Sequence, residues 1–178
     1  MRGLFIVLGC CLTVGCGRST GTDSVAADPI SLKILDFDGL QQLLASHRGH
    51  VVVLDAWSTG CPPCVRDFPQ LVALDRKYRE RGLICISLSF DYEGIGKPDE
   101  QVPRVLQFLR DKGATFDNVL SSVDADTLYQ KLQIASIPVV FVYDRQGKLR
   151  ERFTEPPPGK GLPLYEQVQA AVEKLLVE

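Results

Sequence analysis

Two cysteines, Cys61 and Cys64, stand three positions apart in the segment Cys61-Pro62-Pro63-Cys64. Two thiols at this spacing at a helix start can close a small disulfide ring and open it again. The free N–H groups and the positive dipole end of a helix start stabilise a thiolate, which is the nucleophile of disulfide exchange. We expect Cys61 to attack a partner disulfide and Cys64 to resolve the mixed disulfide. Pro62 and Pro63 fit the first helical turn, where a missing N–H costs little.

The same pair has two other interpretations, a permanent disulfide and half of a metal site. Zinc generally requires four protein ligands in a structural site, and His47 and His50 are the only histidines of the chain. Both precede the apolar segment that leads to the cysteines, and no second cysteine pair follows. A Cys-x-x-Cys pair near a strand–helix–strand pattern favours redox exchange. We therefore expect neither a metal nor a cofactor.

Asp55 is the second residue that could take part in the reaction, because it interrupts an apolar run six positions before Cys61. A buried carboxylate is costly, and burial raises its pKa toward neutrality. Asp55 could then take the proton of Cys64 during resolution, directly or through a water. The alternative is an aspartate at a strand end that binds the backbone. Cys85, in another apolar segment, is interpreted as an unreactive core thiol.

The elements that position these residues follow from the hydrophobic pattern. Residues 51–57 form a nearly continuous apolar run, as in strands buried on both faces, and a helical pattern extends from residue 62 to 81. Further strands are expected at residues 30–36 (an edge strand), 83–90, 139–143 and 148–154, and further helices at 38–47, 102–109, after the capping residue Asp124, and at 164–176. This order predicts an α/β fold, a central mixed sheet flanked by helices on both faces.

The first sixteen residues have the pattern of an export signal, with Arg2 followed by an apolar run that reaches Val14. The run is short for a membrane span. It ends in Thr13-Val14-Gly15-Cys16, which resembles a lipoprotein signal and predicts lipidation of Cys16; Cys10 is a second candidate. A cleaved signal, an uncleaved anchor and a buried N-terminal element stay open. We divide the chain into a signal (1–16), a flexible tether (17–29) and one domain (30–178).

The composition is ordinary: 178 residues, 45% hydrophobic, 24% charged, with a formal net charge of −2. Without a basic stripe, we expect no nucleic-acid binding. The three cysteines that lie beyond the signal are too few for a disulfide framework. We expect a monomer.

Several residues together resemble the thioredoxin superfamily over roughly residues 30–178. The exported Cys-Pro-Pro-Cys pair and an insertion around residues 90–120 resemble its membrane-anchored TlpA/ResA-type branch. The resemblance implies a thioredoxin-like fold with an N-terminal extension. The residues that carry it are Asp55, Trp57, Cys61, Cys64, Pro69 and the dipeptide Ile137-Pro138 before a strand and hairpin.

The resemblance also implies roles for single residues. Cys61 attacks, Cys64 resolves, and Pro138 is cis and faces the disulfide; by itself Pro138 would indicate only the first residue of a strand. The residues expected to contact the substrate are Trp57, Gly60, Pro62 and Ile137. Two positions depart from the pattern: Gly60 replaces a usual Trp, and Asp55 stands where many members of the branch carry Asn.

The implied function is an extracytoplasmic thiol-disulfide oxidoreductase acting on cysteine-containing proteins. We expect it to be a reductant, supplied by a membrane electron donor and often used in cytochrome c assembly, although an oxidant would use the same residues.

Three rival functions use a similar fold. A peroxiredoxin-like peroxidase would match Ser58 but requires Pro where Leu54 stands. A copper-delivery module would need a Cys-x-x-x-Cys pair and a later histidine, and neither is present. A redox-inactive binding module is the third alternative.

Overall fold

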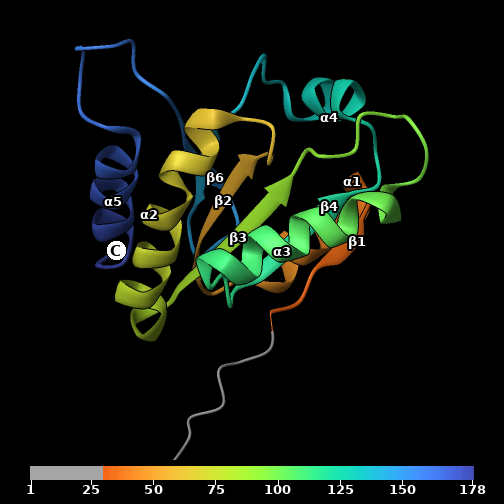
Figure 1. The fold of residues 1–178 in the computed structure, drawn as a ribbon. Coiled ribbons are helices and arrows are strands. Elements are labelled where there is room, and N and C mark those ends of the chain that lie inside the picture. The colour runs from red at the N-terminus through yellow and green to blue at the C-terminus, as the bar shows by residue number, and fades with distance from the viewer. Residues whose placement is uncertain (1–29) are drawn as a thin grey trace, which may run out of the picture.

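The computed structural model describes residues 30–178, and their central feature is a twisted six-stranded sheet (Figure 1). Its order is β1-β4-β3-β2-β5-β6. The four strands β1, β4, β3 and β2 run parallel, and β5 and β6 continue the sheet in antiparallel pairing. The strands are β1 (Lys33–Leu35), β2 (Val51–Trp57), β3 (Leu83–Ser89), β4 (Asp117–Ser121), β5 (Val139–Tyr143) and β6 (Leu149–Thr154).

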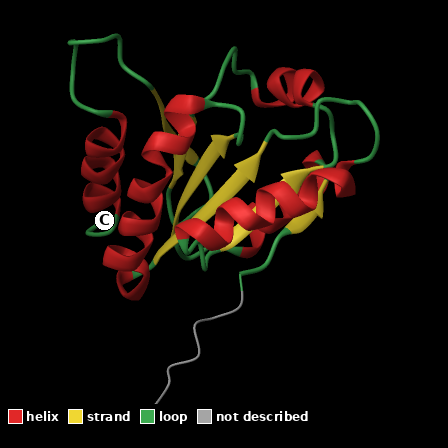
Figure 2. Cartoon of the chain, in the orientation of Figure 1, coloured by secondary structure: helices red, strands yellow, loops and turns green. Residues whose placement is uncertain are grey.

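Helices cover both faces of this sheet (Figure 2). Apolar side chains of α2, α3 and α5 pack on one face, where α2 and α5 lie side by side, and those of α1 and α4 pack on the other. The helices are α1 (Phe37–Ser46), α2 (Pro62–Tyr78), α3 (Val102–Lys112), α4 (Ala125–Leu132) and α5 (Leu164–Leu175), with short 3-10 turns at Arg79–Arg81 and Pro98–Gln101. The predicted α/β fold is confirmed.

The central strand β2 is buried along its whole length. Side chains alternate between the two faces of a strand. Val53, Asp55 and Trp57 therefore point to the layer of α2, α3 and α5, while Leu54 and Ala56 point to the layer of α1 and α4. This alternation explains why the run in the sequence is apolar apart from Asp55, because neither face of β2 meets water.

Local signals fix several element ends. Asp124 caps α4 as predicted, since its carboxylate accepts a hydrogen bond from Thr127 N at 2.9 Å. A tight turn leads into β6: Gly147 has a left-handed φ of 78° and donates its N–H to Asp144 O at 2.9 Å. Gly82, with φ of 96°, ends the 3-10 turn after α2.

The structure differs from the predicted elements at three places. Strand β4 was not predicted, because Asp117, Asn118 and Ser121 leave only two apolar residues in a five-residue strand. The edge strand is shorter than residues 30–36, and the helix predicted over 62–81 ends at Tyr78. Within residues 30–178, none of the helices has the length and apolar character needed to cross a membrane. The predicted signal, tether and lipidated Cys16 lie outside the described residues.

Candidate active site

Cys61 and Cys64 form a disulfide at the N-terminus of α2, with Cα atoms 5.3 Å apart. Strand β2 ends at Trp57, and three loop residues lead to Cys61, which is the N-cap of the helix. Its sulfur accepts a hydrogen bond from Cys64 N at 3.3 Å. Cys61 is half-buried whereas Cys64 is 3% exposed. An incoming sulfur can therefore reach Cys61, while Cys64 stays enclosed.

The segment before β5 lies against Cys61. The Ile137–Pro138 peptide bond is cis, as the resemblance implied, and the carbonyl oxygen of Ile137 lies 3.9 Å from Cys61 Sγ. Ile137 is half-buried, and Gly60 and Pro62 are exposed beside the sulfur. A cavity of about 470 Å³ adjoins these residues; its lining includes Ser58, Gly60, Cys61, Phe90, Tyr129 and Ile137. Of the four predicted contact residues, Gly60 and Ile137 thus line the cavity beside Cys61, and Pro62 follows Cys61 in the chain.

The loop that leads to Cys61 is anchored by Asp91, which follows β3. The buried carboxylate accepts hydrogen bonds from Thr59 N (3.2 Å to each oxygen), Thr59 Oγ1, Ser58 Oγ (3.3 Å) and Ser89 Oγ (2.6 Å). The Arg104 guanidinium on α3 completes the group as an ion pair at 3.0 Å. A carboxylate with this many donors has no desolvated oxygen left unpaired, so its burial is compensated.

Asp55 lies on β2, between Ser87 of β3 and Val140 of β5. It is 3% exposed. Burial raises the pKa of Asp55 to about 7, against the hydrogen bond that Tyr165 donates, and the negative charge of Asp67 adds to the rise. Asp55 therefore carries the high carboxyl pKa expected from the sequence, and its partner is a side chain rather than the backbone.

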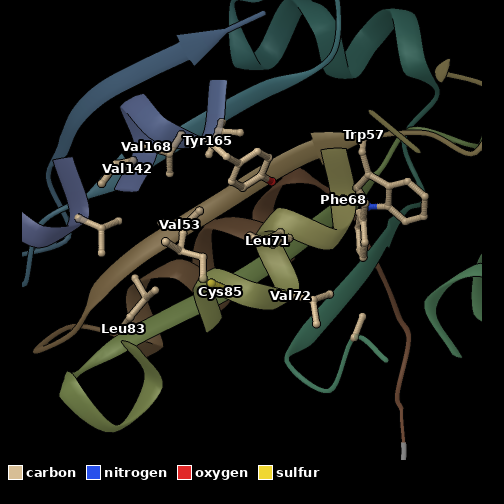
Figure 3. Close-up of a cluster of buried hydrophobic side chains, with 14 of the residues drawn as sticks. Val53, Trp57, Phe68, Leu71, Val72, Leu83, Cys85, Val142, Tyr165 and Val168 are labelled. Carbon is tan, nitrogen blue, oxygen red and sulfur yellow. The ribbon is translucent and has the colours of Figure 1, made fainter. Parts of the chain in front are cut away.

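Trp57 corrects one expectation. Its side chain is fully buried beside Phe68 (Figure 3). The Trp57 ring centroid is 4.8 Å from that of Phe68 and 4.6 Å from that of Phe108. The indole Nε1 finds no hydrogen-bond partner among the described residues. Trp57 thus packs against Phe68 of α2 and Phe108 of α3. It presents no surface to a substrate, because its whole side chain is buried in this aromatic cluster.

The histidines lie away from the cysteines. His47 Nε2 is 2.9 Å from Asp117 Oδ2, and His50 is exposed just before β2. Both precede a seven-residue strand whose far end leads to Cys61, a rise of roughly 23 Å at 3.3 Å per residue. Two histidines and two cysteines cannot meet at one metal across that length. Among residues 30–178, no group of three His, Cys, Asp or Glu side chains could hold a metal ion.

Cys85 is the remaining described cysteine, and its thiol is free and 0% exposed on β3. Burial raises the pKa of this thiol well above its usual value, and the charges of Asp75 and Asp55 add to the rise. A neutral, enclosed thiol is a poor nucleophile, as expected for a core residue.

The sequence reasoning missed Tyr165, Asp91 and Thr59. A sequence signal exists for two of them. Asp91 is a polar residue directly after a buried strand, at the same sheet edge as the loop to Cys61. Tyr165 lies on the apolar face of a predicted helix and carries a hydroxyl that needs a partner when buried. Nothing in the sequence says that this partner is Asp55, 110 positions away.

Comparison with known proteins finds related sequences and structures. The Redoxin family model matches residues 24–169. A curated relative, the thiol-disulfide oxidoreductase ResA of Geobacillus thermodenitrificans, is 27% identical over 119 residues, which are 67% of this chain. This chain spans 63% of the length of that relative. ResA of Bacillus subtilis is 24% identical over 151 residues, which cover 83% of this chain and 79% of that protein.

Two solved structures share the fold. A secreted Mycobacterium tuberculosis disulfide oxidoreductase homologous to E. coli DsbE superposes with a TM-score of 0.56 at 16% identity, covering 74% of this chain and 86% of its own. A thiol:disulfide interchange protein of the thioredoxin family from Chlorobium tepidum gives 0.55 at 20% identity, covering 74% and 83%. These likenesses establish the thioredoxin-like fold.

Proposed function

Because this chain belongs to the Redoxin family, we propose that it is a thiol-disulfide oxidoreductase that exchanges electrons with other proteins through Cys61 and Cys64. The observation that carries the proposal is the disulfide at the N-terminus of α2, with one sulfur reachable and the other enclosed. The names of the curated relatives agree with this activity.

The reaction follows from the positions of the two sulfurs. In the reduced protein, the Cys64 N–H and the helix dipole stabilise a Cys61 thiolate. This thiolate attacks one sulfur of a partner disulfide, a Cys61–partner bond forms, and the partner's other sulfur leaves as a thiolate. Cys64 then attacks Cys61, the internal disulfide forms, and the second partner sulfur leaves. The partner has gained two electrons, which the cysteine pair has lost.

The substrate class is a protein whose cysteine lies on an accessible segment. Such a segment would contact the surface next to Cys61, which includes the exposed Gly60 and Pro62 and the half-buried Ile137. An added Cβ at Gly60 would meet only Ser58 Oγ, at an ordinary 3.6 Å. The absence of a side chain here leaves the approach to Cys61 open to bulky partners.

The direction we propose is reduction, outside the cytoplasm, with electrons from a membrane donor and a lipid anchor at Cys16. The support is the resemblance to the TlpA/ResA-type branch, whose members keep partner cysteines reduced, often in cytochrome c assembly, together with the signal-like residues 1–16. The partners are cysteine-containing proteins, and the acting unit is a monomer.

The reduction potential of the Cys61–Cys64 pair tests the direction. The chain, with Cys10, Cys11 and Cys16 changed to Ser, is equilibrated in dithiothreitol buffers, and the fraction of reduced pair is measured by alkylation. A reduction potential of about −270 mV would support a reductant, and one of about −120 mV would identify an oxidant.

Single variants test the activity itself. Cys61→Ser abolishes exchange with a model disulfide peptide, and Cys64→Ser accumulates the mixed disulfide. Cys85→Ala is the matched control and retains exchange. If the pair does not cycle in any buffer, the activity is refuted and a permanent disulfide takes its place.

A further inference from the structure

Asp55 has one side-chain partner from outside its own sheet. The hydroxyl of Tyr165, in the first turn of α5, donates a hydrogen bond to Asp55 Oδ2 at 2.8 Å. Figure 3 shows the Tyr165 ring lying over the sheet, with its oxygen directed towards β2. No described residue donates to the second oxygen, Oδ1. One oxygen of the carboxyl is thus fixed and the other is free to exchange a proton.

The Tyr165 hydroxyl makes no other hydrogen bond with the described residues. The ring of Tyr165 belongs to the apolar cluster of α2, α3 and α5, where a phenylalanine ring would pack equally well. The oxygen is buried and would require compensation if Asp55 were absent. The hydroxyl and the carboxyl therefore satisfy each other, so the presence of one explains that of the other.

None of the other described titratable groups around Asp55 favours its ionisation. Asp67 of α2 acts on it through like charge, and the Cys85 thiol of β3 is neutral. Among the described residues, the Tyr165 hydroxyl is the one contact that favours the carboxylate of Asp55. The ability of this group to act as a base near neutrality thus depends on a residue of the last helix.

We propose that Tyr165 is a positioning residue for disulfide exchange: its hydroxyl holds Asp55 Oδ2 and leaves the other carboxyl oxygen for proton transfer with the Cys61–Cys64 pair. This proposal rests on the proposed function. In the resolving step, the Asp55 carboxylate takes the proton of the Cys64 thiol and the resulting thiolate attacks Cys61. The bond from Cys61 to the partner breaks, the partner leaves as a thiolate, and Asp55 returns its proton to water. Two electrons pass to the partner and none is left over.

The variant Tyr165→Phe removes only the hydroxyl. We expect resolution of the mixed disulfide at pH 6.5 to slow by about tenfold, the size of effect of one hydrogen bond to a charged group. The midpoint of the pH profile should move upward, because the carboxylate has lost its donor. The measurement is the release of a labelled peptide thiol from the full-length protein, followed by stopped flow from pH 5 to 9.

The matched control is Tyr78→Phe. Tyr78 is also buried between α2 and α5, and its hydroxyl binds Glu173 of α5. This variant loses the same atom from the same helix interface without touching Asp55. Its pH profile should coincide with that of the unchanged protein. If Tyr78→Phe and Tyr165→Phe shift the profile equally, the effect belongs to the interface and the proposal fails.

The double variant Tyr165→Phe with Asp55→Asn tests whether Tyr165 acts through Asp55. Tyr165→Phe should have no effect on the rate once Asp55 is Asn. An unchanged tenfold loss would mean that Tyr165 acts without Asp55 and would overturn the proposal.

A readout independent of activity is the titration of the Asp55 carboxyl followed by its ¹³C signal. The midpoint of this titration should move to higher pH in Tyr165→Phe. If the unchanged protein exchanges no disulfide at any pH, the proposed function fails and the positioning role with it. If Tyr165→Phe shifts the titration of Asp55 but leaves the pH profile of the resolution rate unchanged, the positioning role is refuted while the proposed function stands.

Discussion

The backbone N–H of Thr59 donates to both carboxylate oxygens of Asp91, at 3.2 Å each. The residues are 32 positions apart, on the loop after β2 and at the end of β3. The contact joins the segment directly before Cys61 to the parallel strand beside it. Because a loop residue normally bonds to water or to its own neighbours, this contact fixes the path by which the chain reaches the sulfur.

Asp91→Asn tests that anchor. The amide keeps the shape but replaces one acceptor oxygen with a donor, which faces the N–H and hydroxyl groups of Ser58, Thr59 and Ser89. We expect a loss of unfolding free energy of about 1–3 kcal/mol and slower exchange with a model disulfide peptide. Urea unfolding and peptide reduction measure the two effects.

Arg104→Gln is its control. The Arg104 side chain is 56% exposed, so losing its charge should cost less than about 1 kcal/mol. A variant Asp91→Asn that is as stable and as fast as Arg104→Gln would refute the anchoring role.

Asp55→Asn should stabilise the oxidised protein, and only at neutral and alkaline pH. The pKa of Asp55 is raised from 3.8 to about 7, so the folded protein holds this proton more tightly than the unfolded chain. The penalty therefore builds up as pH rises from about 4 to 7 and is constant above, reaching about 4 kcal/mol at 1.4 kcal/mol per pH unit. Asparagine is neutral throughout and avoids it. Urea unfolding at pH 4 and pH 8 should give little difference from the parent at pH 4 and the full gain at pH 8.

Asp117→Asn should show the opposite pH dependence. Partial burial raises the pKa of Asp117, but hydrogen bonds with Lys33 and His47 outweigh it, and the net shift is downward. The stability from this group is present above pH 4 and lost as pH falls. Asp117→Asn should therefore destabilise the protein at neutral pH and approach the parent in acid. Equal effects of either variant at all pH values would contradict the assigned shifts.

Cys85 should remain unmodified in the native protein. Its thiol is fully buried and its pKa is raised well above the usual value by that burial. After reduction of the disulfide at pH 8, we expect iodoacetamide to label Cys61 faster than Cys85 by on the order of 100-fold or more. Mass spectrometry of the peptides reports each rate. Labelling in guanidinium chloride, where both thiols are open, is the control, and equal native rates would mean that β3 opens readily.

The sequence predicts the parts of this site that depend on local signals. The run from Val51 to Trp57 and the helical pattern after Pro62 place the cysteine pair between strand and helix, because burial on both faces and a helix start are visible in neighbouring residues. Asp55 is predicted for the same reason, as a charge within an apolar run. The cis state of Pro138 follows only from the resemblance to a family, since a strand-initiating proline has the same local pattern.

Contacts between distant segments are not visible in this way. Tyr165 reaches Asp55 only because α5 packs beside α2 on the sheet, and Asp91 reaches Thr59 only because β3 pairs with β2. Trp57 was expected to contact the substrate, yet Phe68 and Phe108 enclose it. Each of these outcomes depends on how distant helices and strands pack together, for which a single sequence carries no local signal.

Strand β4 gives the last prediction, because the buried Asn118 holds it in place. Its amide nitrogen donates to Ala114 O at 2.9 Å, Phe116 O at 2.8 Å and Ser31 O at 3.2 Å, and its oxygen accepts from Ser87 Oγ at 2.8 Å. Asn118→Ala would leave these carbonyls and one hydroxyl without their partner. We expect a loss of about 2–4 kcal/mol in unfolding free energy, from several buried groups at about 1 kcal/mol or more each.

The matched variant Ser87→Ala removes a single donor and should cost only about 0.5–1.5 kcal/mol. Neither residue belongs to β2, α2 or the loop before β5, so the exchange rate per folded molecule should be unchanged in both. Urea unfolding gives the stabilities, and peptide reduction below the unfolding transition gives the rates. A slow but stable Asn118→Ala protein would mean that β4 contributes to the chemistry of Cys61, contrary to its place two strands away from β2 in the sheet.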